Sequence, residues 1–147
     1  QIAQGLHGKV PLLYGVEGAT DAVARRWKTQ INENSKQPAF WNYFPELNHN
    51  EIEGLAGRAL LANMKVILLR SGLDHRRNQK RVEITEEFLQ EHGVEYEEIW
   101  AEGRGKLRGI FSSIYLGDFI SVYLALQSGV DPTPVRLIKR FKERLGQ

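Results

Sequence analysis

The stretch Lys65-Val66-Ile67-Leu68-Leu69 is a short apolar run of the kind that forms a strand buried on both faces of a parallel sheet. A similar run, Val-Pro-Leu-Leu-Tyr, occupies residues 10–14. Residues 39–44 and 94–100 are also predicted as strands. Pro45 ends the first of these, and moderate alternation in the second places it near an edge of the sheet.

Helical patterns separate these runs. Thr20 and Asp21 begin a helix whose apolar face carries Val23, Trp27 and Ile31. Further helices are predicted over residues 50–64, over a well-exposed 74–92, over a long apolar 107–126 that is too buried in character for the surface, and from the 131–134 turn through Leu145. Residues 32–38 are predicted as a polar loop.

Alternating strands and helices are typical of a parallel sheet with helices on both faces, so the fold class is α/β. The 147 residues fit one compact domain, 1–147, able to bury about two thirds of its unfolded surface. The first residue is Gln, which leads us to expect a part of a longer chain.

The composition is that of an ordinary globular protein, with 41% hydrophobic and 26% charged residues and a net charge of +2. We therefore expect no nucleic-acid or membrane partner. The absence of Cys excludes disulfides and thiol catalysis, and is compatible with a cytoplasmic protein. No signal peptide is evident in residues 1–8, and the longest apolar stretch is interrupted by Gly117 and Asp118.

Acids, amides, one histidine and four aromatic residues gather in residues 32–51. We expect this segment at the carboxyl edge of the sheet, where α/β folds bind small polar ligands. On the residues alone, other interpretations stay open: the aromatic residues can be core, Glu33 a loop carboxylate, and His49 a surface or capping residue between Asn48 and Asn50.

Three motifs make the chain recognisable: Asn-Glu-Asn-Ser-Lys (32–36), Pro-Ala-Phe-Trp-Asn (38–42) and Phe-Pro-Glu-Leu-Asn-His-Asn-Glu (44–51). They resemble the second sugar-isomerase (SIS) domain of the bifunctional phosphoglucose/phosphomannose isomerases of archaea and bacteria. Residues 112–118 and 131–135 agree, so the resemblance covers essentially the whole chain.

The resemblance implies a three-layer α/β/α sandwich with a mainly five-stranded parallel sheet that binds phosphosugars. It also implies that Glu33 is the catalytic base and that His49 opens the sugar ring. A lysine of the last helix approaches the substrate; Lys142 is preferred to Lys139 because its helix face, shared with Ile138, should point inward. The polar residues expected to contact the substrate are Asn34, Ser35, Asn48 and Thr133.

These residue types suit aldose–ketose isomerisation. One carboxylate can move a proton between C2 and C1 through a cis-enediol, with no metal or cofactor. A histidine that titrates near neutrality can exchange protons with the ring oxygen and the anomeric hydroxyl. A lysine can stabilise developing oxyanion charge.

The resemblance also implies partners. Active members have an N-terminal SIS domain that supplies a Ser/Thr-rich phosphate loop, which is missing here; Thr20 after Gly18 is only a weak anion site. They are homodimers in which the histidine reaches across from the second subunit. We therefore expect the C-terminal half of a two-domain isomerase, incomplete alone. The alternatives are a phosphosugar-sensing SIS domain without catalysis and an unrelated flavodoxin-like domain.

Overall fold

The computed structural model describes residues 1–146, without the side chains of residues 58 and 59. Its sheet has four parallel strands in the order β2-β1-β3-β4. Their bounds are β1 Val10–Val16, β2 Phe40–Phe44, β3 Met64–Arg70 and β4 Glu95–Trp100. The predicted strand runs are confirmed, including the edge position of β4. The expected fifth strand is absent from the described residues, where the chain passes from β4 directly into two helices.

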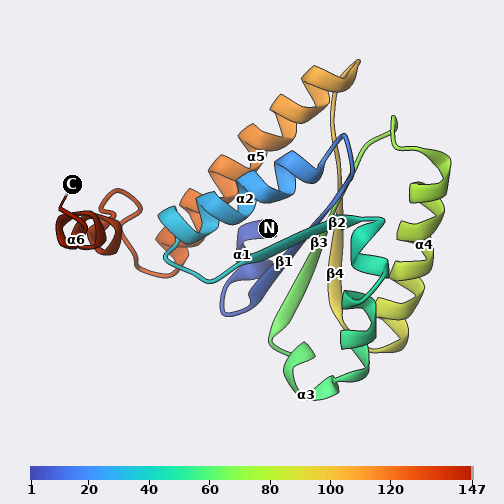
Figure 1. Ribbon diagram of the computed structural model, residues 1–147, viewed down its shortest axis with the longest axis horizontal. Helices are drawn as coiled ribbons and strands as arrows, with labels where there is room; N and C mark the ends of the chain where they lie inside the picture. The colour runs from blue at the N-terminus through green and yellow to red at the C-terminus, as the bar shows by residue number, and fades with distance from the viewer. Residues whose placement is uncertain (147) are drawn as a thin grey trace.

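Helices cover both faces of the sheet, so the expected three-layer sandwich is confirmed (Figure 1). One layer consists of α1 (Ile2–Leu6), α2 (Asp21–Asn34) and α5 (Lys106–Gln127). The other consists of the 3-10 helices η1 (Glu46–Asn48) and η2 (Glu51–Ala56), with α3 (Arg58–Leu61) and α4 (Arg76–Glu91). The last helix, α6 (Arg136–Arg144), projects away from the sandwich at the far left of Figure 1.

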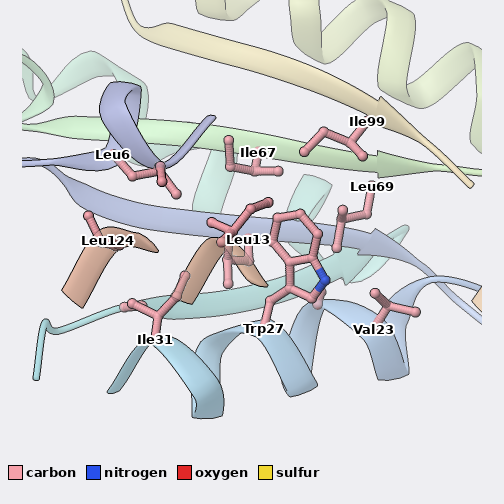
Figure 2. Packing of buried hydrophobic residues seen from close by; sticks show 13 residues of the cluster. Leu6, Leu13, Val23, Trp27, Ile31, Ile67, Leu69, Ile99 and Leu124 are labelled. Carbon is pink, nitrogen blue, oxygen red and sulfur yellow. The ribbon is translucent and has the colours of Figure 1, made fainter. Parts of the chain in front are cut away.

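Two hydrophobic clusters, one on each face, arise from the alternation of side chains along the strands. Ile67 and Leu69 of β3 point into the first cluster, together with Leu13 of β1 (Figure 2). Trp27 and Ile31 of α2 pack there from the helix layer. The intervening residues of β3, Val66 and Leu68, enter the second cluster beneath α4. Because β1 and β3 are buried on both faces, their sequences are apolar almost throughout.

The packing of α2 on α5 has almost no spare room. Trp27 is 1% exposed, and its indole Nε1 donates a hydrogen bond of 2.8 Å to the Ser113 carbonyl. The Trp27 indole ring lies against Gly117, where an added Cβ would come within 2.2 Å of the indole Nε1. Arg26 and Asp118 form an ion pair beside it, at 3.3 Å. The predicted long helix over residues 107–126 is confirmed, since α5 runs through Gly117 and Asp118 unbroken.

The outer face of α5 departs from its predicted burial. Leu107, Phe111, Tyr115 and Leu126 are each more than 60% exposed. Tyr115 also packs edge-on against Phe119, with ring centroids 4.8 Å apart. With 22 residues, α5 is long and apolar enough to cross a membrane by length and composition alone. Its inner face packs into the first cluster, through Ile120 and Leu124, which accounts for part of that apolar character.

The region 50–64 is another difference. Instead of one helix it contains η2, the short α3 and the beginning of β3. Gly54 and Gly57 lie inside this stretch, and glycine lowers the stability of a helix interior.

A charge cluster around the buried Arg70 occupies the carboxyl ends of β3 and β4. The guanidinium of Arg70 pairs with Glu98 and lies 3.9 Å from Glu86 of α4. It also stacks over Trp100, 4.6 Å from the ring centroid. Burial raises the pKa of Glu86 to about 7, and the hydrogen bond and charge of Glu98 add to this effect, against the opposing charge of Arg70.

We predict that Gly117→Ala lowers the free energy of unfolding by about 2 kcal/mol, because the new methyl group collides with a buried indole that cannot move. Urea denaturation followed by tryptophan fluorescence measures this. Gly54→Ala is the matched control, since its added Cβ meets nothing within 4 Å. Equal stability of the two variants would contradict the packing described for α2 and α5.

We predict that Glu86→Gln flattens the pH dependence of stability. The folded protein keeps the Glu86 proton up to about pH 7, whereas the ordinary carboxyl value is 4.5. The folded state thus binds more protons in that window, and stability falls as pH rises through it. Denaturation at pH 5 and pH 8 should show a smaller loss in Glu86→Gln than in the parent chain, while the exposed Glu87→Gln should behave like the parent.

Candidate functional site

A buried threonine lies at the switch point of the sheet, where open parallel sheets usually bind ligands. The strand order reverses between β1 and β3, and ligands generally bind outside the carboxyl ends of such strands. Here Thr20 fills that position: its hydroxyl accepts a hydrogen bond from the Val16 amide (2.9 Å) and donates one to the Leu69 carbonyl (2.6 Å). The side chain is 1% exposed. The Thr20 hydroxyl is therefore used to join β1 to β3.

A cavity of about 680 Å³ opens at the opposite, amino edge of the sheet. It lies between the last turn of α2 and the turn that leads to α6, which are neighbours in Figure 1. Its lining residues are Asn32, Glu33, Lys36, Gly129, Val130, Asp131, Pro134, Val135, Arg136, Leu137 and Ile138. The cavity thus combines apolar walls with one exposed carboxylate from α2 and two basic residues, and it is large enough for a sugar phosphate.

Glu33 owes its position to an extension of α2. The sequence predicted a loop from residue 32, but the helix continues through Asn34. Asn34 Nδ2 donates to the Ser121 hydroxyl of α5, and Ser35 Oγ donates to the Ser121 carbonyl, both at 2.8 Å. Ser35 is 3% exposed. These two polar side chains therefore bind α5 and fix the end of α2 that carries the exposed Glu33.

His49 follows η1 beyond the carboxyl end of β2 and is exposed. Its neighbour Asn48 is anchored on α4 by a hydrogen bond from Nδ2 to the Thr85 hydroxyl, 3.0 Å long. On the other side, Glu51 accepts hydrogen bonds from the Tyr14 hydroxyl (2.6 Å) and from Asn42. Burial, reinforced by the charge of Glu51, raises the pKa of Tyr14. These contacts hold the loop in place and leave the imidazole free of the sheet.

Glu33 and His49 lie at opposite edges of the sheet. Residues 35–39 connect α2 to the amino end of β2, where Gln37 bonds to the Leu6 and Lys9 carbonyls. His49 comes after the full length of the five-residue β2, about 15 Å of strand. The prediction that all of residues 32–51 gather at the carboxyl edge was therefore wrong for Glu33. A helix that returns antiparallel to its strands always ends at their amino edge.

The last helix carries the predicted lysines. The turn before it is confirmed: the Thr133 amide donates to Oδ1 of the cavity residue Asp131 at 2.9 Å. Along α6, however, no residue is buried, and Ile138 is 41% exposed. Lys142 and Lys139 are both exposed, so the expectation that Lys142 points inward was wrong.

Two basic residues at the cavity were missed at the sequence level, Lys36 and Arg136. Lys36 belongs to the Asn-Glu-Asn-Ser-Lys motif, so its closeness to Glu33 was available from the sequence. The sequence did not indicate Arg136, because this residue lines the cavity only when the turn before α6 packs beside α2.

Comparison with known proteins places the whole chain in one family. Residues 1–145 match the family described as the bacterial phospho-glucose isomerase C-terminal SIS domain. Bifunctional phosphoglucose/phosphomannose isomerases of Caldicellulosiruptor bescii and Aquifex aeolicus are 42% and 39% identical to it, over 97% and 99% of this chain. The chain spans only 42% and 45% of those two proteins.

A relative with another activity and a solved structure complete the comparison. A D-glucosamine-6-phosphate 4-epimerase of Sulfolobus acidocaldarius is 30% identical over 98% of this chain and 42% of its own length. The glucose-6-phosphate isomerase like protein of Thermus thermophilus superposes with a TM-score of 0.74 at 22% identity, over 97% of this chain and 45% of that one, which shows the fold. The chain belongs to the family of bacterial phospho-glucose isomerase C-terminal SIS domains.

Proposed function

We propose that this chain is the base-carrying domain of a phosphosugar aldose–ketose isomerase that interconverts fructose 6-phosphate with glucose 6-phosphate or mannose 6-phosphate. The observation that carries this proposal is Glu33, an exposed carboxylate on the wall of a cavity of about 680 Å³, in a chain of this family. Pockets of roughly 300–1,000 Å³ are the usual size for small ligands.

The chemistry needs one proton carrier. In the proposed reaction Glu33 removes the C2 proton of the open aldose, giving a cis-enediolate, and returns a proton to C1 on the same face, while a proton moves from O2 to O1. Lys142 is the proposed partner for the developing oxyanion charge, with Lys139 as the alternative. Thr133, Asn34 and Asn48 are the proposed substrate contacts. Ser35, also expected to contact the substrate, is 3% exposed and bonds to α5 instead.

Ring opening is the proposed task of His49, which would pass a proton to the ring oxygen while the anomeric hydroxyl loses one. Because β2 separates His49 from the cavity of its own chain, we propose a homodimer in which each cavity receives His49 from the partner. A symmetric dimer satisfies this requirement at two sites at once.

A second domain is the remaining proposed partner. The chain spans less than half of its relatives, and it shows no Ser/Thr-rich loop for a phosphate group. The exposed apolar face of α5, with Phe111 and Tyr115, is the kind of surface that another domain covers. We therefore propose a cytoplasmic two-domain enzyme of carbohydrate metabolism, serving glycolysis or gluconeogenesis, whose activity is incomplete in this domain alone.

The epimerase among the relatives supplies a second candidate. It would use the same cavity for an amino sugar phosphate. Parallel assays with fructose 6-phosphate and D-glucosamine 6-phosphate decide between the two. Tight binding of either sugar without turnover by the full-length protein would favour a phosphosugar sensor instead.

We predict that Glu33→Gln in the full-length protein lowers kcat for fructose 6-phosphate isomerisation by about 10²–10⁴, the usual contribution of a general base. Because the Glu33 side chain is exposed, the substitution should not change the stability of the fold. A coupled assay for glucose 6-phosphate and a thermal melt measure the two effects. Exposed Glu143→Gln on α6 is the control. An active Glu33→Gln variant would show that Glu33 is not the catalytic base.

We predict that two inactive variants complement each other. Glu33→Gln and His49→Ala homodimers should each be nearly inactive. After mixing and subunit exchange, half of the dimers carry one intact cavity, so about a quarter of the parent activity should return. Each variant incubated alone is the control. No recovery, with subunit exchange verified by mass spectrometry, would place both residues in the same chain's site.

A further inference from the structure

Lys36 has a backbone conformation that side chains usually avoid. Among residues 1–146 it is the one non-glycine residue with positive φ, at 55°. It stands directly after Ser35, the C-cap of α2, in a position that glycine usually takes beyond the end of a helix. A β-carbon there costs free energy, so a lysine at this position needs a compensating contact from its side chain.

The side chain makes that contact across the cavity. Nζ donates one hydrogen bond to the carbonyl of Glu33 and a second, 3.2 Å long, to the carbonyl of Pro132. The first acceptor belongs to the last turn of α2, and the second to the turn that leads to α6. Lys36 therefore joins the two walls of the cavity that it also lines.

The charges at this point agree with such a role. The C-terminal end of a helix carries negative partial charge, and the Glu33 carboxylate adds to it. Across the gap, hydrogen bonds from Thr133 lower the pKa of Asp131, and the charge of Lys36 adds to that effect. The Lys36 ammonium group therefore attracts both the negative end of α2 and Asp131, and so holds α2 to the turn before α6.

We propose that Lys36 is a positioning residue for the isomerase reaction: it clasps the end of α2 that bears Glu33 to the 129–135 turn, and so fixes the carboxylate relative to the α6 wall. This inference rests on the proposed function of Glu33. It assigns Lys36 no contact with the reacting carbons, and it explains why a strained lysine replaces the glycine that the backbone would favour.

The test compares three variants of the full-length protein with fructose 6-phosphate as substrate. Lys36→Gly and Lys36→Asn both tolerate positive φ but lack the ammonium, whereas Lys36→Arg keeps a donor. We expect kcat to fall about 10- to 100-fold in the first two with KM changed less than about 2-fold, as for a slightly misplaced catalytic group. The melting temperature should be unchanged or higher, and Arg should restore most of kcat.

A wild-type kcat in Lys36→Gly would overturn the proposal, and so would a loss of kcat that Lys36→Arg does not restore. Hydrogen exchange supplies a readout independent of catalysis. Amides of residues 129–135 should exchange about 10-fold faster in Lys36→Gly than in the parent, while those of β1 stay unchanged. Unchanged exchange in that turn refutes the clasp. A parent protein without isomerase activity refutes the proposed function instead, and the exchange result still decides on the clasp.

Discussion

The packing of α2 against α5 is the constraint on which the candidate site depends. Trp27 fits against Gly117 with no space for a methyl group, and its indole donates to the Ser113 carbonyl. Two turns further along the same helix pair, Ser121 receives the hydrogen bonds of Asn34 and Ser35. The buried contact sets the register of the two helices, and the register then brings the polar contact into place. Glu33 is held by a core interaction although it is itself exposed.

The parallel sheet imposes the second constraint. A helix that follows a parallel strand returns to the amino edge, so Glu33 at the end of α2 and His49 after β2 are separated by the length of a strand. No side-chain rearrangement closes such a gap. A reaction that needs both residues must therefore take them from two chains, and the exposed position of His49 suits that requirement.

The local sequence pattern was sufficient to predict the layers of the fold but not the geometry of the candidate site. The apolar face of Val23, Trp27 and Ile31 and the four strand runs were predicted correctly, because burial of each strand and helix face leaves a direct mark in the sequence. The end of α2 was missed because Asn34 and Ser35 favour loops unless a distant residue, here Ser121, accepts their hydrogen bonds. The catalytic roles came from resemblance alone, and they remain predictions.

The apolar character of α5 was misjudged for a related reason. A helix with apolar residues all round is usually interior, yet Phe111, Tyr115 and Leu126 are open to solvent while Gly117 and Leu124 are buried. Composition cannot distinguish a helix buried within its own domain from one buried by two different partners. The same ambiguity applies to α6, where Ile138 and Phe141 are exposed beside the cavity. Both helices keep apolar faces whose burial requires a surface outside these residues, and the cavity between α2 and α6 lies beside one of them. In the proposed assembly, a partner that covers α6 would also enclose the cavity, and its arrival would exclude water from around Glu33.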